Sequence, residues 1–457
     1  MEPSSPNNPL GSNNNRATEF HPFSTSTPHM LAFHLSWLSL FSCFFSTFSI
    51  PPLLPIIRQS LNLSAADVGA AGTAAFVSSI FSRLAMGPAC DLVGPRVASA
   101  TLSILTAPIV LATAFISSPT SFILTRFLVG FCLANFVANQ FWMSSLFSNS
   151  VVGLVNGFAA GWGSMGAGFA QLIMPLLFSL VKSFNVPENN AWRVVFVVPA
   201  TFQAITAVLV LVYGQELPRE NHGDSKRVCD NKPKESLLEV VFNGLTNYRG
   251  WILCLTYGFC FGVEMTMDNI IAQYFYYTFG VKLEVAGIIA ACFGWTNCFA
   301  RPIGGVISDQ MAKWFGIRGR LWGLWVVQTV AGLLCVLMGR VESLGGSIAV
   351  MCVFSVFVQA SSGLTFGIVP FISNRSLGVI SGMTGSGGTV GAVVTQMLLF
   401  SGDKFSTQTS ISMMGLMMIV CSLPISLIYF PRWGGMFCAP YSFHQTSTDE
   451  EDYRLLV

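Results

Sequence analysis

The chain has 457 residues, of which 52% are hydrophobic and only 10% are charged, whereas about 25% of the residues of an ordinary soluble domain are charged. This composition excludes a typical soluble protein and predicts a polytopic membrane protein. The net charge of +2 gives no support to nucleic-acid binding, because the basic residues follow the ends of apolar segments and form no patch.

Twelve apolar segments are long enough to cross the hydrocarbon of a bilayer, which takes about 20 helical residues. A polar segment rich in Asn, Ser and Pro precedes the first of them. We expect this segment, residues 1–28, to be a disordered cytoplasmic tail and not a cleaved signal peptide. The predicted transmembrane segments cover residues 31–55, 68–89, 98–116, 121–147, 153–181, 193–214, 250–276, 285–307, 321–340, 346–372, 377–401 and 409–430.

The segments divide into two groups of six. Residues 29–214 form the expected N-terminal bundle, and residues 250–431 form the expected C-terminal bundle. The polar stretch 215–249 joins the bundles as a central loop, and residues 432–457 form the C-terminal tail. The predicted fold is therefore an all-α membrane protein with 12 transmembrane helices in two halves.

The distribution of Lys and Arg orients the chain, because cytoplasmic loops hold an excess of both residues. With the N-terminus in the cytoplasm, 14 of the 23 basic residues lie on the cytoplasmic side, 7 lie outside, and Arg83 and Arg301 lie within the membrane. Both tails and the central loop are therefore predicted to be cytoplasmic. Asn62, in the sequence Asn-Leu-Ser, is a glycosylation acceptor on the opposite side.

The 12 cysteines predict neither a disulfide framework nor a metal site, because no C-x-x-C occurs and most of them lie inside apolar segments. We expect no metal and no cofactor. The sequence also contains no G-x-S-x-G motif, P-loop or cluster of metal ligands, which argues against an enzyme.

The two halves are internal repeats. Four residues of the second apolar segment recur in the eighth, each pair 218 residues apart. The glycine-rich stretch GLVNGFAAGWGSMGAGFAQ, residues 153–171, matches GVISGMTGSGGTVGAVVTQ, residues 378–396, at a separation of 225. Two six-helix repeats with a substrate site between them form the plan of a secondary transporter. The first set of pairs is Gly69 with Gly287, Arg83 with Arg301, Gly87 with Gly305, and Asp91 with Asp309.

The stretch GPACDLVGPR, residues 87–96, lies between the second and third segments and is partly repeated after the eighth. It combines a glycine for close helix approach, an aspartate that can cap or pair, and a basic residue at a cytoplasmic loop. This pattern resembles the loop signature of the major facilitator superfamily, which implies that family's fold and a conformational role for the loop. The residues concerned are Gly87, Asp91, Gly94, Arg96, Gly305 and Asp309.

Arg83 and Arg301 are the sharpest signal in the sequence. At 1.5 Å per helical residue, Arg83 lies about 12 Å from Asp91, close to the middle of the membrane. A central arginine costs on the order of 3 kcal/mol or more unless it faces a wet cavity or a partner. Since a guanidinium holds a planar oxyanion with two parallel hydrogen bonds, the pair predicts a site for one small flat anion.

The alternative is that each arginine pairs with a buried acid. Only two acids, Glu264 and Asp268, lie inside the apolar segments, one helical turn apart. A structural bridge between Arg301 and Glu264 therefore remains open, whereas Arg83 lacks an obvious carboxylate.

The glycine-rich stretches add a second feature, because glycine at every third to fifth position lets a neighbouring helix or a ligand approach the backbone. GLVNGFAAGWGSMGAG resembles the nitrate signature of the nitrate/nitrite porter family, and SGMTGSGGTVGA resembles its second copy. Three further stretches, residues 33–58, 140–147 and 258–276, resemble the plant high-affinity nitrate transporters. Together these matches cover residues 30–435.

The resemblance implies that Arg83 and Arg301 bind nitrate and that Tyr257 and the glycine-rich helices line the site. It also implies transport of nitrate together with protons by alternating access. This chain has Ser164 where the relatives have asparagine, so a contact from this position is in doubt. The lining positions carried over are Gly163, Ser164, Gly166, Gly388 and Gly391.

Coupling to protons needs a group that titrates within the pathway. Glu264 is the favoured residue, and His34 and Asp268 are the other candidates, since burial favours a protonated carboxyl. His34 can instead bond the backbone near a helix start, and Asp268 can cap or pair locally.

The last residues, TDEEDYRLLV, contain Glu451, Leu455 and Leu456 in the pattern E-x-x-x-L-L. This is a dileucine sorting motif that favours the vacuolar membrane over the plasma membrane, although an acidic run can also be only a solvated tail.

The tails are shorter than is usual for the plant group, which weakens the expectation of the family's small single-span accessory subunit. The competing functions are a facilitator for nitrite or another small anion and a nitrate sensor that does not transport.

Overall fold

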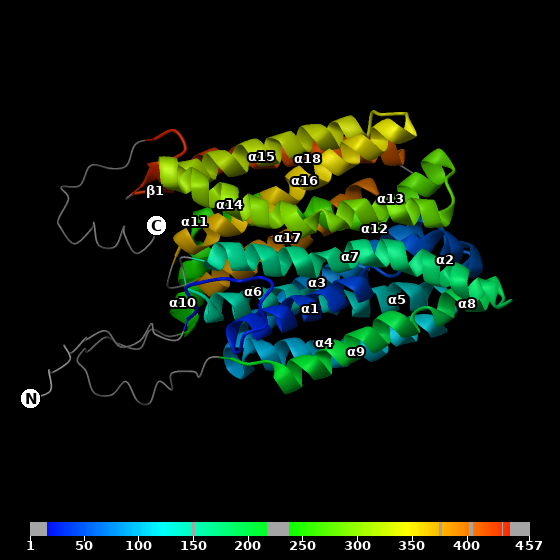
Figure 1. Cartoon of the computed structure of the whole chain (residues 1–457). Helices are drawn as coiled ribbons and strands as arrows, with labels where there is room; N and C mark the ends of the chain where they lie inside the picture. The colour runs from blue at the N-terminus through cyan, green and yellow to red at the C-terminus, as the bar shows by residue number, and fades with distance from the viewer. Residues whose placement is uncertain are drawn as a thin grey trace, which may run out of the picture.

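The computed structural model describes residues 16–148, 151–216, 237–373, 377–401, 405–431 and 433–438. Its helices run along one common direction, and the two halves of the chain lie side by side (Figure 1). The N-terminal half contains α1 (His29–Thr47), α2 (Leu54–Leu61), α3 (Ala65–Val93), α4 (Pro95–Ala112), α5 (Pro119–Val129), α6 (Asn135–Leu146), α7 (Val152–Ser183), α8 (Glu188–Val194) and α9 (Val197–Tyr213).

The C-terminal half repeats this arrangement. It contains α10 (Leu237–Thr246), α11 (Tyr248–Gly258), α12 (Phe261–Phe279), α13 (Leu283–Trp295), α14 (Asn297–Phe315), α15 (Ile317–Met338), α16 (Leu344–Ile368), α17 (Leu377–Leu399) and α18 (Thr407–Ser422). Short 3-10 turns join or extend several helices: Pro51–Leu53, Thr113–Phe115, Gly130–Ala134, Val369–Phe371 and Leu423–Leu427.

Helices occupy all 12 predicted transmembrane segments. Eleven stretches of the described chain are long and apolar enough to cross a membrane. The remaining segment is α17, whose 23 residues also suffice in length but include many Gly, Ser and Thr residues that lower its hydropathy. The expected fold class, 12 transmembrane helices in two six-helix halves, is confirmed.

Several predicted continuous segments are broken in the structure. The fourth is divided into α5 and α6 by a 3-10 turn that begins at Gly130, where a Cβ would collide with the Ala75 carbonyl. The seventh is divided into α11 and α12 at Phe259 and Cys260. Such breaks lie inside a membrane protein only where the surrounding protein satisfies the backbone, and in transporters they often mark the substrate site.

Two segments outside the bundles are more ordered than we expected. Residues 16–28 belong to the tail predicted to be disordered, yet Ala17 pairs with Phe147 in a β-bridge and the Phe20 ring packs 4.9 Å from the Phe33 ring. Aromatic packing against the bundle therefore orders this part of the tail. Residues 1–15 lie outside the described residues.

The central stretch also differs from a plain loop, because α10 lies within residues 215–249 and packs against α11 and α17. Beyond the last helix, β1 (Tyr429–Phe430) and β2 (Gly434–Gly435) form a short antiparallel hairpin. The Trp322 indole donates to the Met436 carbonyl over 3.2 Å and holds this hairpin against α15.

The two halves meet along α7 and along α3. Helix α7 packs on α13 and α14, and α3 packs on α17. Gly168 of α7 lies directly against Gly294 of α13, so that a Cβ on Gly168 would come within 2.9 Å of the Gly294 backbone. The glycine stripe of α7 thus serves close packing between the halves at this level.

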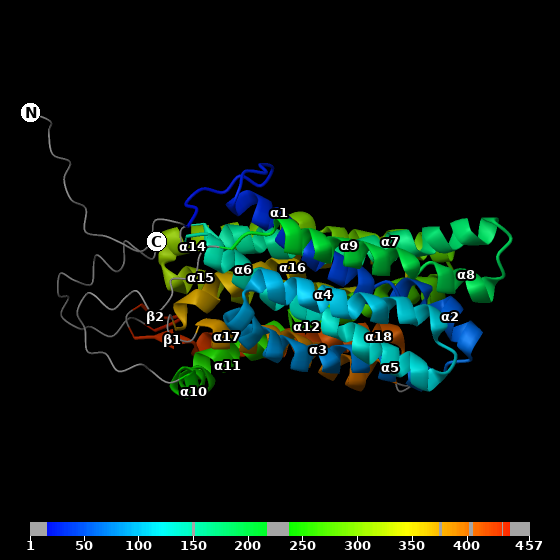
Figure 2. The ribbon, with the colours of Figure 1, turned by 90° about the horizontal axis from the view of Figure 1, so that it is seen from below.

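The α3–α17 contact is tight at one end and loose at the other. We call the end with α10 and β1 the inner end and the end with α2 and α8 the outer end (Figure 2). Near the outer end, a Cβ on Gly69 would lie 2.7 Å from the Ser401 Cα. Towards the inner end, a Cβ on Gly87, Gly382 or Gly385 would meet no atom within 4 Å. The halves are therefore closed at the outer end along this pair of helices.

Candidate functional site

Arg83 is fully buried in α3 and lies between the two halves of the protein. Its Nε donates to the Leu133 carbonyl of the N-terminal half over 3.2 Å, and its Nη1 donates to the Gly385 carbonyl of α17 over 2.8 Å. No carboxylate among the described side chains lies within ion-pair distance of Arg83. The positive charge of Arg83 is thus held only by neutral carbonyl oxygens.

Arg301 is also buried, with 2% of its surface exposed, but it has an acidic partner. Its Nη2 lies 2.7 Å from Glu264 Oε2 and 2.8 Å from Oε1, and its Nε donates to Asn297 Oδ1 over 2.6 Å. Asn297 Nδ2 in turn donates to Glu264 Oε1 over 2.9 Å, and the Ser362 hydroxyl donates to Oε2 over 3.4 Å. The alternative of a bridge between Arg301 and Glu264 is therefore what the structure contains.

A single aromatic ring lies against both arginines. The guanidinium carbons of Arg83 and Arg301 are each 5.1 Å from the centre of the Phe261 ring, at the start of α12. The Phe136 ring of the N-terminal half approaches Arg83 as well, at 5.3 Å. Cation–π attraction offsets part of the cost of the two buried charges.

Tyr257 completes this aromatic wall. Its ring stacks on Phe261 at 5.1 Å, and it lies in the last turn of α11, just before the break in the seventh segment. The Tyr257 hydroxyl lies close to the Arg301 guanidinium but makes no hydrogen bond of normal geometry within the described part of the chain.

Two buried donors at this place are unsatisfied. They are Arg83 Nη2 and the Tyr257 hydroxyl, neither of which has an acceptor among the described residues. Gly385 is buried, yet the position of a Cβ on it has no neighbour within 4 Å. Free space thus lies next to the residue whose carbonyl holds Arg83. Because an unpaired buried donor costs about 1–3 kcal/mol, this combination fits an acceptor-rich ligand such as a small anion.

The glycines expected to line the site divide into two groups. Gly388 faces the aromatic wall, since a Cβ there would lie 3.0 Å from the Tyr257 ring, and Gly391 lies directly against the Gly258 backbone. Gly163 and Gly166 instead pack on α1, where a Cβ would collide with the Leu40 side chain and the Phe41 carbonyl. Contact with the aromatic wall is therefore seen for Gly388 of α17, and close packing against another helix is seen for Gly391 and for the α7 glycines.

Ser164 is buried, and its hydroxyl has no hydrogen-bond partner among the described residues. It lies one residue after Gly163 in α7, and the structure shows no hydrogen bond from it to either arginine of the pair. The structure gives it an available hydroxyl but no role in the arginine network.

The three residues expected to titrate lie in different surroundings. Glu264 is fully buried, and its carboxylate accepts hydrogen bonds from Arg301, Asn297 and Ser362. Asp268, one turn further along α12, is 2% exposed, and its Oδ1 has no partner within the described residues. His34 bonds the Ser24 carbonyl through Nε2 over 2.9 Å and accepts from the Trp37 indole through Nδ1. His34 thus makes the backbone contact named as its alternative, near the inner end of α1.

The loop motif lies at the inner end, away from the arginines. Gly94 adopts φ 86° and joins α3 to α4 as a one-residue connection, a backbone conformation that favours glycine. The Arg96 amide donates to Glu216 Oε1 over 2.6 Å, and its Nη1 donates to the Gly214 carbonyl. In the second half, Asp309 pairs with Arg320 over 2.8 Å.

The two glycines of this motif at equivalent positions in the repeats, Gly87 and Gly305, have different surroundings. Gly305 faces the Gly153 carbonyl at the start of α7, and Gly87 faces open space. Asp91 lies in α3, and its side chain is outside the described atoms. The sorting residues Glu451, Leu455 and Leu456 lie outside the described residues.

Sequence reasoning missed several residues of this region. Arg126 is one of the seven basic residues that the sequence places on the outer side, but it is buried in α5 with 3% exposure and donates to Asn269 Oδ1 over 2.9 Å. Asn297 and Phe261, which hold the arginine pair, gave no separate signal, because Asn and Phe are unremarkable in an apolar segment. The offset of four residues between Asn297 and Arg301 was the one available indication.

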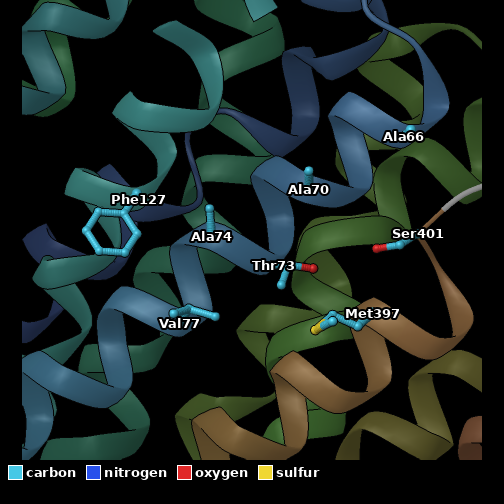
Figure 3. Close-up of a pocket in the computed structure, with 8 residues that line it drawn as sticks. All are labelled: Ala66, Ala70, Thr73, Ala74, Val77, Phe127, Met397 and Ser401. Carbon is cyan, nitrogen blue, oxygen red and sulfur yellow. The ribbon is translucent and has the colours of Figure 1, made fainter. Parts of the chain in front are cut away.

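A pocket of about 500 Å³ opens between α3, α5 and α17 (Figure 3). Small and apolar side chains line it, among them Ala70, Val77, Phe127 and Met397, and none of its lining residues is charged. It is therefore a poor site for an anion and differs from the arginine site in both position and chemistry.

Two helical halves that are internal repeats, with buried arginine side chains between them, are the architecture of a membrane transporter and not of an enzyme. The sequence profile of the Major Facilitator Superfamily matches residues 36–396. The chain belongs to this superfamily and, within it, to the nitrate/nitrite porter family that includes the plant high-affinity nitrate transporters.

Relatives in plants and algae match nearly the whole chain. The "High affinity nitrate transporter 2.7" of Arabidopsis thaliana is 60% identical over 449 residues, covering 96% of this chain and 90% of that protein. The "High-affinity nitrate transporter 2.3" of Oryza sativa subsp. japonica is 54% identical and covers 96% and 84%. The "Nitrate transporter 2.1" of Chlamydomonas reinhardtii is 42% identical and covers 93% and 78%.

Solved structures share the fold at much lower identity. A bacterial homologue of the human lysosomal transporter Spinster, in an inward-facing and occupied conformation, is 14% identical with a TM-score of 0.66 and covers 88% of this chain and 97% of its own. A nucleoside transporter is 15% identical with a TM-score of 0.58 and covers 86% and 98%.

The buried bridge gives a first testable prediction. Glu264→Ala leaves the Arg301 charge buried without its partner, which costs about 3–5 kcal/mol. We expect a clear drop in the thermal midpoint of the purified protein in detergent. The double variant Glu264→Leu with Arg301→Leu removes both charges, and it should recover most of the loss. An equal drop in the single and the double variant would contradict the assignment of a paired buried charge.

Proposed function

We propose that this protein transports nitrate across a membrane by alternating access, with the anion held between Arg83 and Arg301. The observation that carries the proposal is the state of Arg83: a buried guanidinium without a carboxylate, with Nη2 unpaired and with free space at Gly385, whose carbonyl accepts from Nη1. The names of the plant and algal relatives supply the substrate.

Nitrate matches the chemistry of this site. It is planar and carries one negative charge on three acceptor oxygens, so it can receive Arg83 Nη2 and the Tyr257 hydroxyl together. The rings of Tyr257 and Phe261 form a flat wall that suits a flat ligand. A single negative charge also compensates the one arginine of the central pair that has no carboxylate, which a neutral ligand does not do.

Arg301 is available to the anion only when Glu264 releases it. Glu264 and nitrate compete for the same guanidinium, because both offer oxygens to Arg301 Nη2. A proton on Glu264 removes its negative charge and weakens the bridge, so protonation favours binding of nitrate between the two arginines. This competition makes Glu264 the proposed coupling residue and links proton uptake to anion uptake.

Asp268 is the second carboxyl in this mechanism. Its Oδ1 is buried and has no partner among the described residues, and it lies one turn from Glu264 on the same helix. An anion that moves with more than one proton carries net positive charge, so a membrane potential then drives uptake. In the alternating-access cycle, the nitrate between the halves screens the repulsion of Arg83 and Arg301 and lowers the energy of the closed intermediate.

The first test of this function is uptake of isotopically labelled nitrate into proteoliposomes. Arg83→Gln and Arg301→Gln each remove a charge-assisted contact, and we expect the specificity constant for nitrate to fall about thirtyfold or more. Arg340→Gln, at an exposed position, is the matched control and should stay within about twofold of the parent protein. If the parent moves no nitrate, or if only nitrite competes for uptake, the substrate assignment is wrong.

The coupling step is tested by Glu264→Gln, which imitates the protonated carboxyl. We expect an inward proton gradient to stimulate uptake by the parent protein but not by this variant, while exchange of nitrate for nitrate continues. Asp268→Asn is the comparison. Loss of the gradient response in Asp268→Asn together with its survival in Glu264→Gln would move the coupling role to Asp268.

We further propose that the protein resides in the vacuolar membrane, on the basis of the dileucine pattern at Glu451, Leu455 and Leu456. A fluorescent fusion of the full chain should label the vacuolar membrane of plant cells. The variant with Leu455→Ala and Leu456→Ala should shift the label to the plasma membrane. Label at the plasma membrane in both proteins would contradict the proposal.

A further inference from the structure

A third buried arginine lies outside the site described above. Arg126 is on α5, and 3% of its surface is exposed. Within the described side chains, no carboxylate lies within ion-pair distance of its guanidinium. Like Arg83, it is a buried cation held by neutral oxygens, so its charge is uncompensated.

The partners of Arg126 come from both halves of the protein. Its Nη1 donates to the carbonyl of Thr47, the last residue of α1, over 3.0 Å. Its Nη2 donates to Asn269 Oδ1 on α12 over 2.9 Å. A free carbonyl at a helix C-terminus favours a cation and remains with the N-terminal half, whereas the Asn269 contact crosses to the other half.

Asn269 belongs to the outer closure between α3 and α17. Its Nδ2 donates to Gln396 Oε1 of α17 over 3.3 Å. Gly72 of α3 lies against both side chains, since a Cβ there would be 2.8 Å from Asn269 Nδ2 and 3.1 Å from the Gln396 side chain. Arg126 therefore lies where the two halves close at the outer end.

The layer of Arg126 and Asn269 lies on the outer side of the arginine pair. Asn269 follows Glu264, the partner of Arg301, by five residues of α12, which places it about 7.5 Å further towards the outer end. Any ion that reaches the pair from the outer face must pass this level.

We propose that Arg126 is an outer anion-binding residue of the transport path, which holds a small oxyanion before it reaches Arg83 and Arg301. When the outer end opens, the separation of the halves takes Asn269 away from Arg126. The guanidinium keeps Thr47 but loses its second acceptor, and it then faces the opened path with an uncompensated charge. The oxyanion replaces the Asn269 oxygen, and the return of Asn269 on closure displaces the anion inward. This inference rests on the proposed transport of nitrate.

The simpler role to be distinguished is that of a latch. A latch needs only the hydrogen bond between Arg126 and Asn269, and it acts on the rate of opening and closing. A binding residue needs the positive charge of Arg126 and acts on the concentration of anion that half-saturates uptake from the outer face. The two roles therefore change different kinetic constants.

The experiment compares three variants in proteoliposomes, with labelled nitrate as the probe. Arg126→Gln removes the charge and keeps an amide donor, and Arg126→Lys keeps the charge. Asn269→Asp is nearly isosteric and neutralises Arg126 in place. We expect Arg126→Gln and Asn269→Asp to raise KM about tenfold, whereas Arg126→Lys should stay within about threefold of the parent.

Equilibrium binding of nitrate to the purified protein in detergent separates this proposal from the central site. Binding should stay within about twofold in all three variants, because Arg83 and Arg301 are untouched. A change in kcat alone, with KM unchanged in Arg126→Gln and Asn269→Asp, would reduce Arg126 to a latch and overturn the proposal. If Arg126→Gln does not fold, Asn269→Asp alone decides, since a latch predicts a stronger bond and a lower kcat at constant KM. No binding by the parent protein would instead refute nitrate as the substrate.

Discussion

The constraint on which this structure depends is the burial of positive charge within a membrane. Three arginines, Arg83, Arg126 and Arg301, lie between or beside the two halves with almost no exposed surface. An arginine in hydrocarbon costs on the order of 3 kcal/mol or more, so each needs acceptors that the fold must supply. The fold supplies them by bringing carbonyl and amide oxygens from both halves to the same place. The association of the halves and the solvation of the cations are therefore one problem.

The three arginines differ in the partners that compensate their charge. Arg301 has a full carboxylate partner in Glu264, whereas Arg83 and Arg126 have only neutral oxygens. If both central arginines were paired with carboxylates, no positive charge would be left for an anion. If neither were paired, the cost of burying the two charges would be larger. One paired and one unpaired arginine leave a single net charge at the centre, which matches a monovalent anion. In the proposed coupling, a proton on Glu264 would change the number of central arginines without an ionised partner from one to two.

The sequence predicted the fold well because membrane helices are recognised by their length and hydropathy. It also predicted Arg83 and Arg301, since a charge in an apolar segment is conspicuous, and it offered the Glu264 bridge as an alternative. It missed Arg126, which lies only seven residues into α5 and is indistinguishable from an interfacial residue without the tertiary packing. The breaks at Gly130 and Phe259 were missed for the same reason, since they depend on contacts with α3 and α17. Nor could pattern alone tell that Gly163 and Gly166 of α7 pack on α1 while Gly388 of α17 faces Tyr257.

Helix α12 is the element through which these features act together. Two glutamines that occupy equivalent positions in the repeats, Gln171 and Gln396, bond neighbouring residues of this helix: the Asp268 carbonyl and the Asn269 side chain. The same helix presents Glu264 to Arg301 and Asn269 to Arg126. A rotation or shift of α12 therefore changes the central bridge and the outer closure at once. The break at Phe259 and Cys260 separates α12 from α11, so the seventh segment is not one continuous helix. In the proposed transport cycle, anion binding, proton binding and closure of the outer end are therefore linked through the position of α12.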